Sequence, residues 1–448
     1  MGRLKANERT SEIRECNSAY QGVRMSEANC LSTEKGSLWR DRNFMCLWMG
    51  QSVSEMGSSI TNIILPLLAI TTLSATPGEI GLLRAMASIA VLLASIPSGV
   101  YIDRFNKRSL MIACDFVRAA ILVTVPLFAF YDQLSIYWLY AVSFLCSVFS
   151  VAFGIAYHSY YPIFVQRKDL PEANSKIETT ESAARVGGPG IGTFMAGWIG
   201  APLTLLFDVV SYIASAVLLS FTKTDESSKV KVTKRPPLLQ EIGEGFKLLY
   251  ANSVLARTAL TTIGSMFCLA MMNAVFLYYL ISDLKISPQM VGIIFFIGEG
   301  GGLLAAILAS ALMRSVGSAK IMWWVVFLSP AGFLLGGAQS HPLLLPTLYL
   351  CLTSVRFVLF DIAQYSYRQS SCPLESLGKV TASIRTCIGV AAASGAIFGG
   401  WLGSVASPVA SIFTATVLMC VSSLPVIFSA LRHTKNIEDL PALTPLDR

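Results

Sequence analysis

The sequence predicts an all-α integral membrane protein with twelve transmembrane helices arranged as two six-helix bundles. Its composition is the first observation: 54% of the 448 residues are hydrophobic and 14% are charged, whereas soluble domains carry about 25% charged residues. The second is that the apolar residues gather in runs of roughly 20, the length that crosses a bilayer. The third is a repeat: an offset of 203 residues aligns segments from the two halves of the chain.

Windows of about 19 residues give the twelve spans. The first six are 44–71, 80–101, 110–131, 135–158, 177–199 and 203–221, and the second six are 256–281, 289–313, 320–338, 344–366, 380–402 and 408–431. The fifth and eleventh spans are rich in Gly, Ser and Ala, which makes them the least apolar.

The spans divide the chain into five parts. These are a cytoplasmic tail expected to be disordered (1–43), a first bundle (44–221), a cytoplasmic linker (222–253), a second bundle (254–431) and a cytoplasmic tail (432–448). Within the linker, residues 222–240 are charged, lack aromatics and contain Pro236–Pro237, a composition typical of linkers. Leu238–Tyr250 has apolar residues at helical spacing, which predicts a helix on the membrane surface. Met1 and Met25 are both possible translation starts.

Lys and Arg set the orientation. Of the 34 basic residues, 27 fall in segments on one side of the twelve spans and one, Lys285, falls on the other. Basic residues stay in the cytoplasm, so both termini are expected there. The net charge of +7 therefore reflects topology and lipid headgroups, and it does not indicate a nucleic-acid partner. A bacterial inner membrane is the expected location.

The sequence lacks the residues that several classes of protein function require. The ten cysteines are scattered without a C-x-x-C pair, and the three histidines are isolated, so no metal site, cofactor or disulfide framework is expected. No G-x-x-x-x-G-K-[ST] phosphate loop occurs, which argues against ATP as the driving force. A membrane-embedded enzyme would need a convergent nucleophile, base or metal set, and none is apparent. We therefore expect a protein that is not an enzyme.

The loop GVYIDRFNKR joins the second and third spans. Its charged and small residues are Gly99, Asp103, Arg104, Lys107 and Arg108. This spacing resembles the signature G-x-x-x-D-R-x-G-R-[KR] of the major facilitator superfamily, whose fold is two six-helix bundles. The resemblance implies that Asp103 helps to hold the outward-facing state closed on the cytoplasmic side. Asn106 replaces the usual Gly, and Asn tolerates a left-handed turn. The alternative is that the loop only determines topology.

The repeat agrees with that family. It aligns Lys176 with Lys379, Gly192 with Gly395, and Gly197-Trp198 with Gly400-Trp401. Chance similarity between apolar segments is the alternative, although Trp and Lys are rare in such spans. Parallel repeats of this kind place the substrate site between the halves, near the membrane midplane.

A second motif lies in the fifth span. Gly188-Pro189-x-x-Gly192 resembles the antiporter motif of drug–proton exchangers. Proline frees a backbone carbonyl and glycine allows close helix contact. Gly and Pro are common in membrane helices, so a purely structural role is the alternative.

Other segments are similar to the macrolide-efflux and enterobactin-exporter branch. They are 43–60, the Asp115-x-x-Arg118 pair, 170–176 and Asp208, and the similarity extends from Asn43 to Leu431. Two departures concern the proton pathway. Gly57 is followed by Ser58 where the branch often has an acid, and the fourth span lacks the Arg of many drug–proton exchangers.

Five acids lie five or more residues inside the ends of the spans: Glu55, Asp115, Asp208, Glu299 and Asp361. Intramembrane carboxylates are costly, so each requires a partner or a function. Asp115 and Arg118 can pair on one helix face, and Asp208 is expected to be structural. Glu55, Glu299 and Asp361, with Arg356 near the last, are the candidates for proton or substrate binding. Ion pairs that pack helices remain the alternative.

The seventh span contributes flexible and aromatic side chains. They are Met266, Phe267, Met271, Met272 and Phe276. Such residues suit varied lipophilic ligands, although they could equally face lipid.

Together these features predict a monomeric secondary exporter of an amphiphilic drug, antibiotic or natural product. The resemblance implies proton antiport and alternating access, with the small substrate, protons and membrane lipids as partners. Three alternatives stay open: a siderophore exporter of the same fold, an uptake symporter and a membrane-embedded enzyme.

Overall fold

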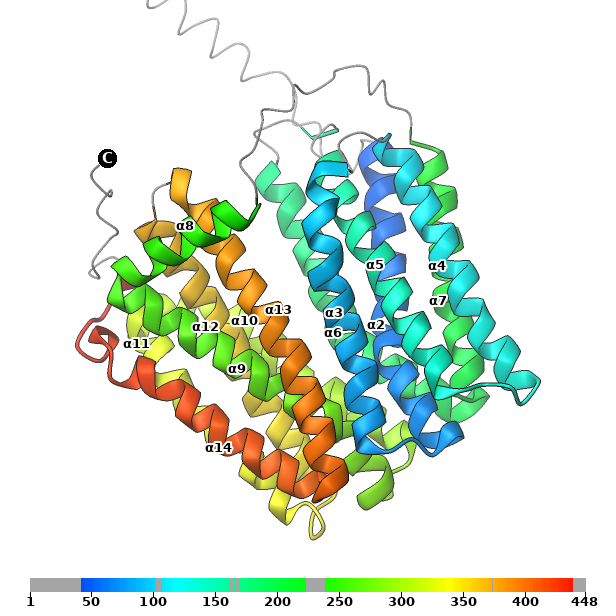
Figure 1. The fold of residues 1–448 in the computed structure, drawn as a ribbon. Coiled ribbons are helices and arrows are strands. Elements are labelled where there is room, and N and C mark those ends of the chain that lie inside the picture. Colours follow the sequence, from blue (N-terminus) through cyan, green and yellow to red (C-terminus); the bar gives the residue numbers. More distant parts are fainter. Residues whose placement is uncertain are drawn as a thin grey trace, which may run out of the picture.

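The structure is a computed structural model that describes residues 42–101, 106–161, 164–165, 170–222, 238–372 and 374–437. Within these ranges the regular elements are all helices (Figure 1). The N-terminal half holds α2 (Arg42–Leu73), α3 (Pro77–Tyr101), α4 (Lys107–Phe130), α5 (Ile136–Tyr160), α6 (Leu170–Ile199) and α7 (Ala201–Ser220). The all-α prediction is confirmed for this part of the chain.

The C-terminal half has the same order of long helices. It holds α8 (Leu238–Ala251), α9 (Ser253–Tyr278), the π-helical turn η4 (Tyr279–Asp283), α10 (Pro288–Val316), α11 (Ser318–Trp324), the 3₁₀ segment η5 (Val325–Gly337), α12 (Leu344–Ser371), α13 (Leu374–Val405), α14 (Pro408–Ile427) and the short η6 (Ala430–Arg432). The predicted surface helix Leu238–Tyr250 corresponds to α8, which packs against α13 through Gly245 and the Lys379–Glu244 ion pair. Whether α8 lies on a membrane stays a prediction.

Eleven helical segments in the described ranges are long and apolar enough to cross a membrane. The remaining predicted span, the fifth (177–199), corresponds to α6, which is long enough but too polar, because Glu172, Glu178, Glu181 and Arg185 lie along it. It nevertheless packs among the other long helices, against α2 and α10. A polar helix enclosed by neighbours is tolerated because its charges need not face lipid.

The predicted span 320–338 is not one regular α-helix. A short α11 gives way to η5, in which Pro330 cannot donate the backbone hydrogen bond of an α-helix. Within η5, Gly332 lies so close to Thr416 of α14 that a Cβ would be 2.0 Å from its hydroxyl oxygen. Tight contact with α14 therefore accompanies the change in helix type.

We call the end of the bundle at which α7 ends and α8 begins the linker end, and the other the opposite end (Figure 1). At the opposite end one hydrophobic cluster contains buried residues of both halves, including Ile64, Leu205, Val275 and Ile294. At the linker end the buried residues form two clusters, one in each half. Among the described residues, the halves thus share one core only at the opposite end.

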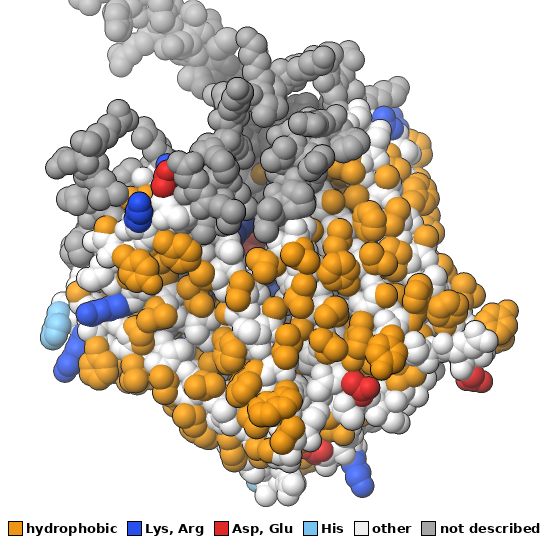
Figure 2. Space-filling model, viewed as in Figure 1, with side chains coloured by type: hydrophobic (Ala, Val, Ile, Leu, Met, Phe, Trp, Pro, Cys, Tyr) orange, Lys and Arg blue, Asp and Glu red, His pale blue; other side chains and the backbone are white. Residues whose placement is uncertain are grey.

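The sequence repeat corresponds to a structural one. In the N-terminal half α6 packs against α2 and, across the halves, against α10. In the C-terminal half α13 packs against α9 and, across the halves, against α3. Trp198 and Trp401 occupy equivalent places near the opposite end and are 76% and 53% exposed, as expected for aromatic residues at a membrane interface. Figure 2 shows hydrophobic side chains over most of the visible side of the molecule, which suits contact with lipid.

Candidate functional site

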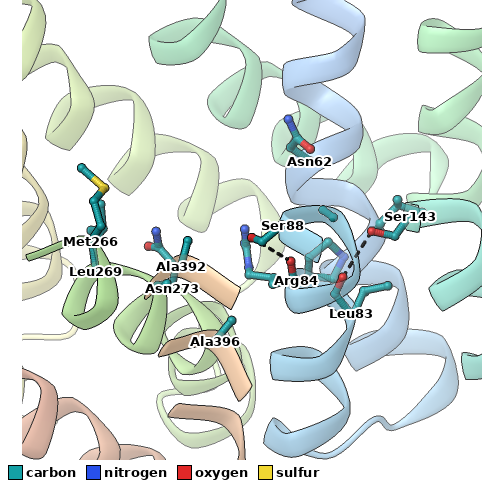
Figure 3. Close-up of a pocket in the computed structure, with 14 residues that line it drawn as sticks. Asn62, Leu83, Arg84, Ser88, Ser143, Met266, Leu269, Asn273, Ala392 and Ala396 are labelled. Carbon is teal, nitrogen blue, oxygen red and sulfur yellow. Dashed lines mark hydrogen bonds between the residues drawn. The ribbon is translucent and has the colours of Figure 1, made fainter. Parts of the chain in front are cut away.

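A cavity of about 280 Å³ lies between the two halves. Its walls come from α2, α3 and α5 on one side and from α9 and α13 on the other. The polar residues that line it are Asn62, Arg84, Ser88, Ser143 and Asn273, and the rest are Leu, Met, Ala and Pro. Figure 3 shows Arg84 and Ser88 between Asn62 of α2 and Asn273 of α9. An apolar pocket with a few convergent polar groups is typical of small-molecule sites.

Arg84 is the one charged residue among those that line the cavity. Its Nε is buried and has no hydrogen-bond partner among the described residues. Neither does it form an ion pair with any carboxylate there, as the ion pairs of the described chain involve other residues. The sequence places Arg84 inside the span 80–101 and predicts no function for it. The available signal was the absence of an acid three or four positions away, where Ile80, Gly81, Ala87 and Ser88 stand.

Beyond the cavity, towards the opposite end, α3 and α13 close the space between the halves. The backbone N–H of Gly78 donates to Ser404 Oγ at 2.6 Å. A Cβ on Gly81 would lie 2.8 Å from Gly400 Cα and 2.4 Å from the carbonyl oxygen of Ala396. No larger residue fits at Gly81 without moving one helix, so the glycines bring the two halves into backbone contact.

A second contact between the halves joins α6 and α10. A Cβ on Gly292 would lie 2.7 Å from the carbonyl oxygen of Gly190. Nearby, Gln289 Nε2 donates to the carbonyl oxygen of Gly197 at 2.8 Å. Both contacts between the halves therefore combine small residues with a hydrogen bond to the backbone.

The antiporter-like motif is part of this second contact. Gly188 faces Ser59 of α2, where a Cβ would lie 2.4 Å from Ser59 Cβ, and Gly192 faces Ile60. Pro189 cannot donate a backbone hydrogen bond, and Thr193 Oγ1 donates to the carbonyl of Pro189 at 2.7 Å. The motif thus seats α6 against α2, while Gly190 on the other side meets the C-terminal half.

Arg185 brings three of the predicted carboxylates into one electrostatic environment. The charge of Arg185 acts on the carboxyls of Glu55 on α2 and, across the halves, of Glu299 on α10 and Asp361 on α12. On Asp361, Arg356 and Arg368 act more strongly than Arg185. The Arg185 side chain is 68% exposed and pairs with Glu178 at 3.6 Å. Glu299 also accepts a hydrogen bond from Ser354 Oγ at 2.7 Å. The three carboxylates were predicted separately from the sequence, and Arg185 had no predicted role.

Glu178 and Glu181 were also missed. The carboxyl of Glu181 interacts electrostatically with those of Glu55 and Glu178, so like charges from α2 and α6 face one another. The signal in the sequence is the run of charged residues at helical spacing along an otherwise small-residue helix.

Asp115 and Arg118 form a buried ion pair on α4. The guanidinium lies 4.7 Å from the ring centre of Phe153 and 4.2 Å from that of Tyr212. Asp208, which is fully buried, accepts hydrogen bonds from Thr61 and Ser211. These groups connect α2, α4 and α7 inside the N-terminal half and do not line the cavity.

Arg356 lies inside the C-terminal half rather than in the cavity. It is 2% exposed and donates to Ser329 Oγ at 3.0 Å and to Ser265 Oγ at 2.9 Å. The charge on Asp361 lies within its electrostatic range. The arrangement connects α12 with α9 and η5, which suits helix packing.

The signature loop is only partly within the described residues. Asp103 and Arg104 lie outside them, and Gly99 belongs to α3 without a described environment. Lys107 begins α4. Arg108 Nε donates to the carbonyl of Leu219 at 3.0 Å, and its Nη2 to that of Ser220, so it caps the end of α7. Asn106, which would tolerate a left-handed turn, does not adopt one: its φ is −62°, and its side chain caps α4 by accepting a hydrogen bond from Ser109 N.

The seventh span divides between two environments. Met266 lines the cavity. Met271, Met272 and Phe276 are almost fully buried in the core that the halves share, so they do not face lipid. Among the described residues no group of His, Cys, Asp and Glu could hold a metal ion.

Comparison with known proteins places these observations in context. The sequence model of the Major Facilitator Superfamily matches residues 47–394. A transporter of the same type from Bacillus subtilis, YvqJ, described as uncharacterized, is 24% identical over 82% of this chain and 87% of its own length. YkuC from the same organism is 24% identical over 49% of this chain, and the match spans about half, 52%, of that relative.

Two relatives have named activities. Macrolide efflux protein A of Streptococcus pyogenes is 23% identical over 54% of this chain and 60% of its own length. The multidrug efflux pump Tap of Mycobacterium tuberculosis is 23% identical over 57% of this chain and 62% of its own.

Solved structures share the fold. A bacterial homologue of the iron transporter ferroportin in its inward-facing state superposes with a TM-score of 0.70 at 15% identity, covering 87% of this chain and 98% of that one. The nucleoside transporter NupG gives a TM-score of 0.64 at 15% identity over 87% of this chain and 98% of its own.

Proposed function

Because the chain belongs to the major facilitator superfamily, we propose that it is a secondary active exporter of an amphiphilic small molecule, driven by proton antiport. It is a multi-pass membrane transporter rather than an enzyme. What we propose is the direction of transport, its energy source and the class of its substrate. The observation that carries it is the cavity between the halves, closed towards one end by the two contacts between them and lined by apolar side chains around a cation.

The shared core at the opposite end corresponds to one state of an alternating-access cycle. If the linker end is cytoplasmic, as the distribution of Lys and Arg predicts, this state is closed to the outside. Substrate would then enter from the cytoplasm or the inner leaflet. Separation of α3 from α13 and of α6 from α10 would open the cavity to the outside, and the predicted function of Asp103 is to hold the linker end closed in that second state.

Proton coupling rests on the carboxylates around Arg185. Glu299 and Asp361 belong to one half and Arg185 to the other, so closure of the linker end would change their separation. A carboxylate near a cation favours its ionised form, and one withdrawn from that cation into apolar surroundings favours its protonated form. The cycle of closing and opening would thereby load and release a proton.

The efflux relatives support export of drugs or antibiotics, although each matches only part of its length and is about 23% identical. A siderophore exporter of the same fold is the second candidate. The cation in the cavity favours it, because siderophores commonly carry acidic groups.

Efflux from cells tests the proposal. The chain would be produced in a drug-sensitive bacterial host, preloaded with members of a panel of lipophilic antibiotics, dyes and siderophores, and the loss of each compound would be followed with and without a proton uncoupler. Efflux of at least one compound that stops on addition of the uncoupler is expected. Efflux that continues unchanged would contradict proton coupling, and the absence of efflux for the whole panel would contradict export.

A further inference from the structure

We propose that the ligand of the central cavity is an amphipathic organic anion whose acidic group binds Arg84. The inference rests on the proposed transport function and narrows its substrate class. It starts from a charge imbalance: the cavity is lined by one cation and by no carboxylate.

The position of Arg84 makes its charge costly. Arg84 lies seven residues after the start of α3 at Pro77. At the helical rise of 1.5 Å per residue this puts it about 10 Å along the axis from that end. Arginine does not lose its proton in proteins. An intramembrane cation must therefore find a counter-charge or water.

The neighbours of Arg84 do not supply that counter-charge. No carboxylate of the described chain pairs with it, and its Nε lacks a hydrogen-bond partner there. Arg118, in contrast, has Asp115, and Arg356 has three serine hydroxyls. A guanidinium that is left open towards a cavity offers a planar pair of donors that matches a carboxylate or sulfonate.

The rest of the cavity defines the remainder of the ligand. Met266 and Leu269 provide an apolar wall on α9, and methionine adapts to rings of different shape. Asn62 and Asn273 provide amide groups on either side of Arg84 (Figure 3). A ligand with a small apolar ring system and one acidic group would satisfy both kinds of wall. A cationic ligand would meet an unpaired like charge.

Binding of three matched probes tests the inference on the purified full-length protein. The probes are 1-naphthoate, 1-naphthamide and 1-naphthylmethylamine, which share the naphthalene ring system and differ in charge. Isothermal titration would measure their affinities. A charge-assisted hydrogen bond is stronger than a neutral one, so 1-naphthoate is expected to bind about tenfold or more tightly than the amide, and tenfold corresponds to about 1.4 kcal/mol.

Variants of one residue separate charge from packing. Arg84→Gln should bring the affinities for naphthoate and naphthamide together, while Arg84→Lys should keep much of the difference. Arg314→Gln, which removes an exposed arginine at the end of α10, is the control and should leave the difference unchanged. Equal binding of acid and amide by the wild type, binding of none of the probes, or a preference for the acid that survives Arg84→Gln would overturn the inference.

The outcome is separate from that of the transport proposal. Naphthoate binding that depends on Arg84, combined with no uncoupler-sensitive efflux of any compound, would sustain the anion site and reject export. Uncoupler-sensitive efflux with equal binding of acid and amide would sustain export and reject the anion site.

Discussion

Gln289 at the start of α10 donates a hydrogen bond to the backbone carbonyl of Gly197 near the end of α6, at 2.8 Å across the two halves. A Cβ on Gly197 would lie 2.2 Å from the Gln289 amide carbon, so the bond depends on glycine. Together with the Gly78–Ser404 bond, it holds the opposite end closed. Since both bonds join parts that must separate in an alternating-access cycle, they are direct targets for experiment.

Gly292→Leu should weaken that closed end. A Cβ there would lie 2.7 Å from the carbonyl oxygen of Gly190, so the larger residue forces α6 and α10 apart. Overpacking of this kind costs about 1–3 kcal/mol, which changes a two-state population about tenfold. A cysteine introduced into the cavity by Asn273→Cys, in a background without other reactive cysteines, reports access to the cavity. It should react faster with a membrane-impermeant maleimide added on the side of the membrane that the opposite end of the bundle faces.

Gly300→Leu is the matched control on the same helix, because a Cβ at Gly300 meets nothing within 4 Å. Equal labelling rates in both variants would mean that the α6–α10 contact does not govern access to the cavity.

Glu299→Gln should uncouple transport from the proton gradient. The amide keeps the hydrogen bond from Ser354 but can neither take up nor release a proton. The uncoupler-sensitive accumulation of substrate should fall about tenfold or more, the range for loss of a proton-transfer group. Exchange of labelled for unlabelled substrate should continue. Glu172→Gln, which removes a half-exposed carboxylate paired with Lys176, is the control. Normal accumulation of substrate by Glu299→Gln would mean that another carboxylate carries the proton.

Arg185→Gln should impair the same step from the other half. The change removes the cation that Glu55, Glu299 and Asp361 share. Uncoupler-sensitive substrate flux should fall about tenfold relative to the wild type and to Arg314→Gln. Unchanged flux would show that Arg185 does not influence the carboxyl that carries the proton.

Arg118→Met should destabilise the N-terminal half. It leaves the buried Asp115 without its cation and removes a charge near Asp208. Breaking a buried pair costs about 3–5 kcal/mol, whereas replacing both members, as in Asp115→Leu with Arg118→Met, should cost less. Denaturant unfolding in mixed micelles would measure both. A double variant less stable than the single one would show that the pair contributes to stability beyond charge balance.

Asp103→Asn tests the signature loop. If the acid latches the linker end in the outward-facing state, transport should fall about tenfold, in line with loss of one charge-assisted hydrogen bond. Glu172→Gln, outside the loop, is the control and should transport normally. Substrate flux at the wild-type rate in Asp103→Asn would mean that the loop only determines topology.

The helices could be predicted well because the length of an apolar run and the placement of charges are local properties of the sequence. The boundaries of α2, α4 and α14 agree with their spans to within a few residues at the start. The 3₁₀ character of η5 was missed because it accompanies contact with α14, which a window of the sequence does not contain. The intrinsic preferences of Asn106 allow a left-handed turn, but capping of α4 determines its conformation.

The site was less predictable for the same reason. Glu55, Glu299 and Asp361 could be named because acids are rare in membrane spans. Their common partner, Arg185, could not, since the relationship joins helices from opposite halves. Arg84 was visible as a cation without an acid nearby, yet only the folded chain shows that it lines the cavity.

The central claim is that proton movement through this chain drives a substrate across the membrane. Proteoliposomes containing the purified protein, with an imposed pH gradient and a substrate identified in the efflux screen, test it most directly. We predict uphill substrate accumulation that collapses when an uncoupler is added and that is lost in Glu299→Gln. Accumulation that persists without the gradient, or an equal rate in protein-free liposomes, would contradict the account.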